Sequence, residues 1–243
     1  MNIFLKNKKY LYGMVSKNKK KSLTLYEPTY MMQAHESREE EIKMKTWFTS
    51  DLHFGHANIV GWRNSAGSNF SSVEEMNDLI IRNFNSMVAP DDQVIFMGDL
   101  AMGLIADSLP LLGQLNGVKK SVVGNHDRVF KGEGKKKNKP EKIAMWQDRY
   151  RDEAGVEFIE DQWFFDSNGN KLFFMSHFPT SGDHTAEERF TSFRPNIDEN
   201  DWLVHGHVHN GWKVNGKQIN VGVDVWDFKP VSLEQILGII KGE

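Results

Sequence analysis

The chain has 243 residues, of which 39% are hydrophobic and 12% aromatic, and its formal net charge is −3. That length and apolar content suffice for one domain with a sizeable core, and the small net charge gives no overall attraction to nucleic acid or membrane. The absence of cysteine excludes disulfides and thiolate-bound metals, and no apolar run reaches the roughly 20 residues that a membrane-spanning helix needs.

The first 43 residues differ in composition from the rest of the chain. Seven lysines precede the first acidic residue, Glu27, and the segment lacks the apolar stretch of a signal peptide. We interpret residues 1–43 as a basic, weakly ordered extension and residues 44–243 as the folded domain. Two alternatives remain open: residues 17–21 contact nucleic acid or another anionic surface, or translation starts at Met44.

Strands and helices alternate through the first half of the folded domain. We predict strands over 46–50, 94–97 and 121–123, and a helix over 109–115. Ser72 and Glu75 have the spacing of a capping box, and apolar residues at helical spacing follow them. This order predicts an α/β sheet, in which side chains that follow successive strands meet in one crevice.

The second half of the domain has a more antiparallel character. Strands over 158–165 and 171–176 flank an Asn-Gly turn, and a further strand covers 202–204. A last hairpin around Asn215-Gly216 leads to a C-terminal helix over 233–240. The lysine-rich stretch 132–142 is predicted to be a solvated loop.

Five of these segments end in side chains of the kinds that bind metals. In chain order they read Asp51-x-His53, Gly98-Asp99, Gly124-Asn125-His126-Asp127, Ser176-His177 and Gly206-His207-Val208-His209. Nitrogen and oxygen ligands of these types suit Mn, Fe or Zn, and two such ions about 3.5–4 Å apart can hold both the attacking and the leaving oxygen at phosphorus. Each block alone is also typical of a turn, a helix cap or a structural histidine. Five blocks in this order at strand ends indicate one site.

The five blocks resemble the pattern of the calcineurin-like metallophosphoesterases, which is D-x-H, GD, GNH[DE], H and GHxH. The similarity runs from Met44 nearly to the C-terminus and includes Asn220-Val221-Gly222-Val223-Asp224. The stretch 47–56 is most similar to small bacterial and phage-encoded members. The resemblance implies a sandwich of two mixed β-sheets flanked by helices, with a catalytic domain over 44–243.

The resemblance also implies roles for individual residues. The first metal would be held by Asp51, His53, Asp99 and His209, and the second by Asp99, Asn125, His177 and His207. Asp99 would bridge the pair, and a hydroxide bridging the metals would attack phosphorus. His126 would stabilise the transition state or protonate the leaving oxygen, so His126 and Asp99 are the expected catalytic residues. We expect two divalent ions, with Mn²⁺ favoured and Fe, Zn or Ni as alternatives.

Three further residues are candidates for contact with the substrate. His56 and Arg63 follow the first ligand pair, and Arg128 follows the Gly-Asn-His-Asp block. A surface or supporting polar contact is an equally good interpretation of each of them.

The favoured function is hydrolysis of a small phosphodiester, with nucleotides or cyclic nucleotides as the expected substrates and a cytoplasmic location. The alternatives are a phosphomonoesterase, a dinucleoside-polyphosphate hydrolase, a nuclease that uses the lysines of 17–21 and 135–139, and a non-catalytic scaffold. Residues 98–103 lack the second acid and the arginine of the G-D-x-x-D-R-G pattern, which argues against a protein Ser/Thr phosphatase. The exact substrate, the native metal and the oligomeric state do not follow from the sequence.

Overall fold

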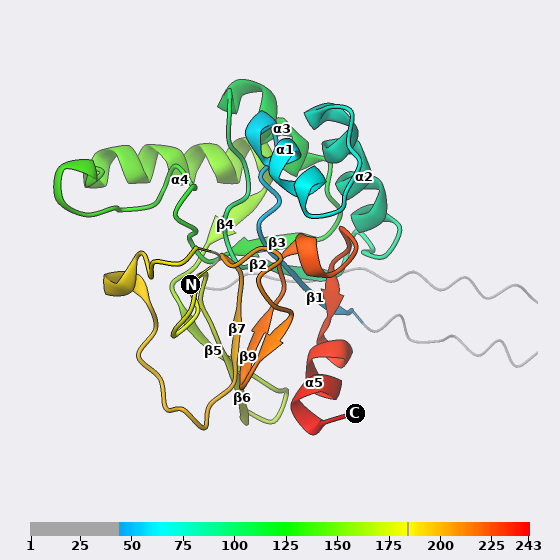
Figure 1. The fold of residues 1–243 in the computed structure, drawn as a ribbon, viewed down its shortest axis with the longest axis vertical. Helices are drawn as coiled ribbons and strands as arrows, with labels where there is room; N and C mark the ends of the chain where they lie inside the picture. The colour runs from blue at the N-terminus through cyan, green and yellow to red at the C-terminus, as the bar shows by residue number, and fades with distance from the viewer. Residues whose placement is uncertain (1–43, 184) are drawn as a thin grey trace, which may run out of the picture. The chain divides into compact units, whose positions relative to one another are not determined.

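The computed structural model describes residues 44–183 and 185–243, and the expectations for residues 1–43 lie outside this part of the chain. Two five-stranded β-sheets form its centre (Figure 1). The strand order is β10-β1-β2-β3-β4 in the first sheet and β5-β6-β7-β9-β8 in the second. Each sheet contains both parallel and antiparallel pairs, and helices flank them. The predicted fold is therefore confirmed.

The first sheet is built on four parallel strands. They are β1 (Thr46–Thr49), β2 (Gln93–Phe96), β3 (Val118–Ser121) and β4 (Val156–Phe158), and β10 (Val231–Ser232) pairs antiparallel with β1. In β1 the consecutive residues Trp47 and Phe48 are both buried, 6% and 0% exposed, because both faces of the sheet are covered. The carboxyl ends of these strands lie at one edge, where the polar blocks follow them.

The second sheet begins later in the chain than expected. Residues 156–158 complete the first sheet, so the prediction of one strand over 158–165 is wrong. The second sheet opens with the hairpin of β5 (Gln162–Phe165) and β6 (Lys171–Met175). It continues through β7 (Leu203–His205), β8 (Val214–Asn215) and β9 (Gln218–Asn220). β7 is parallel to both β6 and β9, because long connections precede and follow it.

Five α-helices lie in the described part of the chain. They are α1 (Ala57–Ser65), α2 (Val73–Asn85), α3 (Ile105–Gly113), α4 (Pro140–Ala154) and α5 (Leu233–Lys241). Figure 1 shows α1 to α4 on the side of the first sheet that faces away from the second, and α5 near the β1 edge. The predicted start of α2 is confirmed, since the Ser72 hydroxyl accepts from the Glu75 N–H at 3.2 Å. α1 and α4 were not predicted.

Two buried cores hold the layers together. One lies between the helices and the first sheet and includes Phe54, Phe84, Phe96, Leu100 and Leu109. The other joins the two sheets and includes Phe48, Ile95, Met97, Phe173, Val204 and Ile219, with Ile236 of α5. Because this second core fixes one sheet on the other, the loops that follow β1, β2, β3, β6 and β7 meet at a common rim. None of the helices in the described residues is long and apolar enough to cross a membrane.

Candidate metal centre

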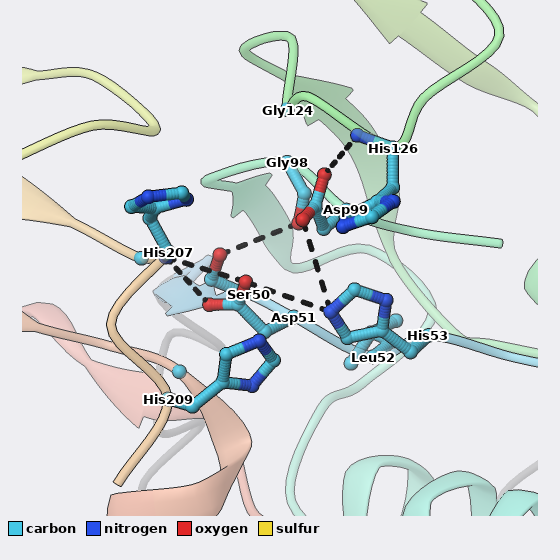
Figure 2. Close-up of polar contacts among 12 residues, drawn as sticks. Ser50, Asp51, Leu52, His53, Gly98, Asp99, Gly124, His126, His207 and His209 are labelled. Atoms are coloured by element: carbon cyan, nitrogen blue, oxygen red, sulfur yellow. Dashed lines mark hydrogen bonds and ion pairs between the residues drawn. The ribbon is translucent and has the colours of Figure 1, made fainter. Parts of the chain in front are cut away.

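The seven predicted metal ligands converge at this rim. Asp51 and His53 follow β1, Asp99 follows β2, Asn125 follows β3, His177 follows β6, and His207 and His209 follow β7. Backbone bonds join the loops, including Asp51 N–H to Gly98 O and His53 N–H to Asp99 O, both at 3.1 Å. The His207 N–H donates to Asp51 Oδ2 at 3.0 Å and so connects the two sheets at the site. Figure 2 shows Asp51, His53, Asp99, His207 and His209 around a common centre.

Most of the predicted ligands have a left-handed backbone conformation. Asp51, His53, Asp99, His207 and His209 have φ between 50° and 70°, and eight non-glycine residues of the described chain have positive φ. Such a conformation costs of order 1–3 kcal/mol per residue and is concentrated at functional sites. The sharp turn after each strand directs these side chains inward. Gly124 has a related role, because a Cβ there would overlap the Asp99 carboxylate.

One group of donor atoms surrounds the end of β1. Each of Asp51, His53 and His209 has a side-chain nitrogen or oxygen that could bind a metal, and these three atoms lie within 4.8 Å of one another. All three residues are buried. His53 Nε2 lies 3.9 Å from Asp51 Oδ1 and 3.7 Å from Asp99 Oδ2. This buried nitrogen has no hydrogen-bond partner among the described residues. A cation between these atoms would satisfy the nitrogen and the two carboxylates together.

A second group lies on the other side of Asp99. His177 Nε2 is 3.5 Å from Asp99 Oδ2 and 3.1 Å from Asn125 Oδ1, and His207 Nδ1 is 3.0 Å from the same amide oxygen. The other carboxylate oxygen of Asp99 accepts from the His126 N–H at 2.8 Å. Asp99 Oδ2 therefore faces both groups, as a bridging ligand would.

The four histidines of these groups are each held from outside the site. The outer contacts are His53 Nδ1 to Met102 Sδ at 3.1 Å, His177 Nδ1 to Met97 O at 2.6 Å, His207 Nε2 to Asp183 Oδ2 at 3.2 Å and His209 Nδ1 to Asp224 Oδ2 at 3.0 Å. An imidazole that donates through its outer nitrogen presents a lone pair at the inner one. Lone pairs that converge with carboxylate oxygens fit divalent cations.

The pKa of the Asp99 carboxyl group is raised, so a bound cation would stabilise its ionised form. Burial and the charge of Asp51 raise the pKa of Asp99 to about 6, although His177 opposes this shift. Asp127 supports Asp99 from behind, because its carboxylate accepts from the backbone N–H groups of Asp99, Leu100 and Gly124 at 2.8–3.1 Å. These bonds tie the loops after β2 and β3 together. Asp127 thus acts on the backbone of the ligand loops.

A cavity of about 230 Å³ opens beside the first group. Its lining consists of His53, His56, Asn58, Ile59, Trp62, His126, Arg189 and His209. The His126 ring lies 5.4 Å from the His53 ring and 6.4 Å from the His56 ring. Two residues expected to act on the substrate, His126 and His56, are therefore adjacent to the ligand groups.

The two arginines expected at the substrate lie elsewhere. Arg63 is 1% exposed, and its guanidinium donates to Asp224 Oδ1 and to Asp51 O, both at 2.7 Å. Arg63 is therefore a buried support for Asp51 and Asp224, which is the second of the two interpretations that the sequence left open for it. Arg128 is exposed, donates to Gly103 O at 3.3 Å and is absent from the cavity lining.

The Arg63–Asp224 pair allows a test of this supporting role. Arg63 and His209 lower the pKa of Asp224 to about 2 although burial opposes that shift. We expect Arg63→Ala to lower the free energy of unfolding by about 3–5 kcal/mol, since it removes the guanidinium from a buried carboxylate and leaves only His209 as its ion-pair partner among the described residues. Arg149→Ala, which breaks an exposed pair with Glu153, should cost less than about 1 kcal/mol. Urea denaturation measures both, and equal small losses would contradict the assignment.

Three charged residues of the site were not identified from the sequence. Asp183 and Arg189 lie in the connection between β6 and β7, which carries no recognisable motif. Asp224 lies in the closing segment already noted, 15 residues beyond His209, and only its ion pairs reveal its role. A carboxylate partner for each histidine of the GHxH block would have been the signal to seek.

Comparison with known proteins identifies the family. The model of the calcineurin-like phosphoesterase family matches residues 44–211, a span that contains all seven predicted ligands. The chain belongs to the calcineurin-like phosphoesterases. Membership makes this calcineurin-like phosphoesterase a metal-dependent phosphoester hydrolase, and its buried histidine–aspartate clusters are the candidate metal sites.

Its relatives include phage-encoded proteins, as the sequence indicated. It is 32% identical over 204 residues to the gene 66 protein of Mycobacterium phage L5, and the aligned region covers 80% of this chain and 93% of the relative. An uncharacterised protein of Methanocaldococcus jannaschii is 32% identical over 206 residues, 81% of this chain and 92% of the relative. A solved structure of a protein of unknown function from Aquifex aeolicus shares the fold, with 22% identity, a TM-score of 0.56, and coverage of 81% of this chain and 99% of that one.

Proposed function

We propose that this calcineurin-like phosphoesterase is a phosphodiesterase that uses two divalent ions, with Mn²⁺ the favoured metal. Asp51, His53, Asp99 and His209 would hold the first ion, and Asp99, Asn125, His177 and His207 the second. The observation that carries this proposal is the arrangement of the four histidines, each of which has one ring nitrogen engaged outside the site. The other nitrogens of His53, His177 and His207 face Asp51, Asp99 or Asn125, and His209 has a ligand atom within 4.8 Å of those of Asp51 and His53.

The chemistry divides between the metals and the chain. Two bound divalent ions would lower the pKa of a water molecule and polarise the phosphoryl oxygens. Hydrolysis breaks one P–O ester bond, leaving a hydroxyl oxygen on phosphorus and a proton on the departing oxygen. His126, which lines the cavity beside the ligands, would stabilise the transition state or supply that proton. Its backbone bond to Asp99 Oδ1 fixes its position relative to the metal ligands.

The lining of the cavity favours a substrate that carries an aromatic group. A phosphomonoester needs room for one organic group, whereas a diester must place a second group beside the metals. Ile59 and Trp62 give one wall of the cavity apolar surface, and Asn58 adds a hydrogen-bonding amide. An indole can stack on a nucleobase, so nucleotides or cyclic nucleotides are the proposed substrates.

A metal and substrate screen tests the proposal. The full chain is stripped of metal and reconstituted separately with Mn²⁺, Fe²⁺, Zn²⁺ or Ni²⁺. Hydrolysis is then measured for an aryl phosphomonoester, an aryl phosphodiester, and 2′,3′- and 3′,5′-cyclic nucleotides. We expect the highest kcat/KM on a diester with Mn²⁺ and no turnover without metal. Preference for the monoester would overturn the diesterase assignment, and full activity without metal would overturn the metal mechanism.

The salt dependence of turnover separates small substrates from polynucleotides. A small diester contacts mainly the metal centre, so its turnover should change little between low and high salt. A polynucleotide bound through several lysines would release counterions, and its turnover would fall steeply with salt. Efficient oligonucleotide cleavage with a steep salt slope would make the chain a nuclease.

A further inference from the structure

Arg189 is the arginine of the described residues that lines the cavity beside the metal ligands. It shares that lining with His53, His126 and His209, although it comes from the long connection between β6 and β7. Its side chain is 42% exposed, so a ligand in the cavity can reach it. Its place in the cavity is the first reason to assign it a role.

The carboxylate of Asp183 fixes this arginine at two points. Asp183 Oδ1 accepts from Arg189 Nη2 at 3.0 Å, and Asp183 Oδ2 accepts from the backbone N–H of Arg189 at 3.2 Å. The Asp183 side chain is fully buried, and the guanidinium also lies 5.8 Å from the ring of Phe190. Phe190 has a left-handed backbone, with φ of 55°, which for a bulky residue persists only where the surroundings determine it. A side chain held in this way loses little further freedom when it binds a ligand.

The same carboxylate holds a predicted metal ligand. Asp183 Oδ2 lies 3.2 Å from His207 Nε2, and His207 Nδ1 faces Asn125. Asp183 therefore sets Arg189 and His207 in a fixed relation to each other. An arginine placed at random on the loop would have no such link to the metal centre.

A guanidinium beside two dications is repelled by them unless an anion lies between the charges. Its planar donors match the oxygens of a phosphate group. We propose that Arg189 binds a non-bridging oxygen of the substrate phosphate, and that Asp183 is the residue that positions it. This inference rests on the proposed phosphodiesterase function and adds a substrate-binding residue to it.

Two substitutions separate charge from structure. Arg189→Gln keeps an amide that can still donate to Asp183 but removes the positive charge, and Arg189→Lys keeps the charge without the planar fork. In the Mn²⁺-loaded full chain, Arg189→Gln should weaken the Kd of inorganic phosphate about 10- to 100-fold and lower kcat/KM on the aryl diester by a similar factor. Arg189→Lys should recover part of both losses. Arg82→Gln, on the exposed surface of α2, is the matched control and should change neither.

Metal content distinguishes binding from a structural effect. It should stay at the wild-type level in Arg189→Gln, because His207 retains its bond to Asp183. Unchanged phosphate affinity in Arg189→Gln would overturn the inference, and so would a loss of phosphate affinity that only follows a loss of bound metal. If Arg189→Gln does not fold, phosphate affinity of Arg189→Lys equal to that of wild type overturns it. If the wild-type chain hydrolyses no diester, the proposed function fails, while calorimetry with inorganic phosphate still decides the role of Arg189.

Discussion

Replacement of Asp99 by asparagine is expected to abolish tight metal binding and to lower kcat/KM on an aryl phosphodiester by about 10³-fold or more, since metal stabilisation of the transition state contributes several kcal/mol. One oxygen of Asp99 lies 3.7 Å from His53 Nε2 and 3.5 Å from His177 Nε2, between the two ligand groups. The substitution keeps the shape of the side chain and removes its charge. Both metal sites should therefore weaken together.

The measurement combines metal content after dialysis with steady-state kinetics across a range of added Mn²⁺. Asp92→Asn is a suitable control, because Asp92 is also buried and accepts from Trp47 Nε1 at 2.9 Å and Lys45 N at 2.8 Å. It directly precedes β2, at the end of that strand opposite the rim where the ligands meet. We expect Asp92→Asn to lower stability while retaining metal and activity. Wild-type metal content and turnover in Asp99→Asn would contradict the proposed bridging role.

The ligand residues could be predicted from sequence because their signal is local. Asp51 and His53 are two positions apart just beyond the end of β1, and His207 and His209 are two positions apart just beyond the end of β7. This spacing lets both members of a pair point toward the same rim. All four residues have positive φ values, because the backbone turns sharply after β1 and after β7. Asp99 gave a weaker signal on its own, and its position gained meaning only from the other blocks.

The supporting charges could not be predicted, because their partners are distant in sequence. Arg63 is separated from Asp224 by 161 residues, and Asp183 is separated from His207 by 24. An arginine shortly after a ligand pair therefore suggested a substrate contact, whereas packing beneath Asp51 buries it. The arginine that does line the cavity, Arg189, lies in a connection without periodicity or motif.

Local composition also explains the missed helices. α1 contains Gly61 and is preceded by His56, whose side chain makes no capping hydrogen bond, so neither a start signal nor a regular apolar stripe marks it. α4 begins at Pro140 and ends at Ala154, and the next residue, Gly155, has a left-handed φ of 67°. Pro140 and Gly155 are good boundary signals, but the preceding lysines and glycines made the segment resemble a loop. Its buried residues, Tyr150 and Ala154, come only in its last turns.

His126→Ala is expected to retain both metals and to lower kcat on an alkyl diester by about 10²–10⁴-fold, the usual range for loss of a general acid or base. The backbone of His126 is bonded to Asp99 and its ring lines the cavity, 5.4 Å from the His53 ring. The ring is not among the groups of donor atoms that could hold an ion. Its loss should therefore reduce turnover without emptying the metal sites. His53→Ala is the matched comparison, since it should lose metal and activity together. Metal content that falls in step with activity in His126→Ala would instead make His126 a ligand.

A leaving group of low pKa needs no proton, so the loss on an activated aryl diester should be smaller than on an alkyl diester if His126 protonates the departing oxygen. Equal losses on both substrates would leave stabilisation of the charged transition state as its contribution.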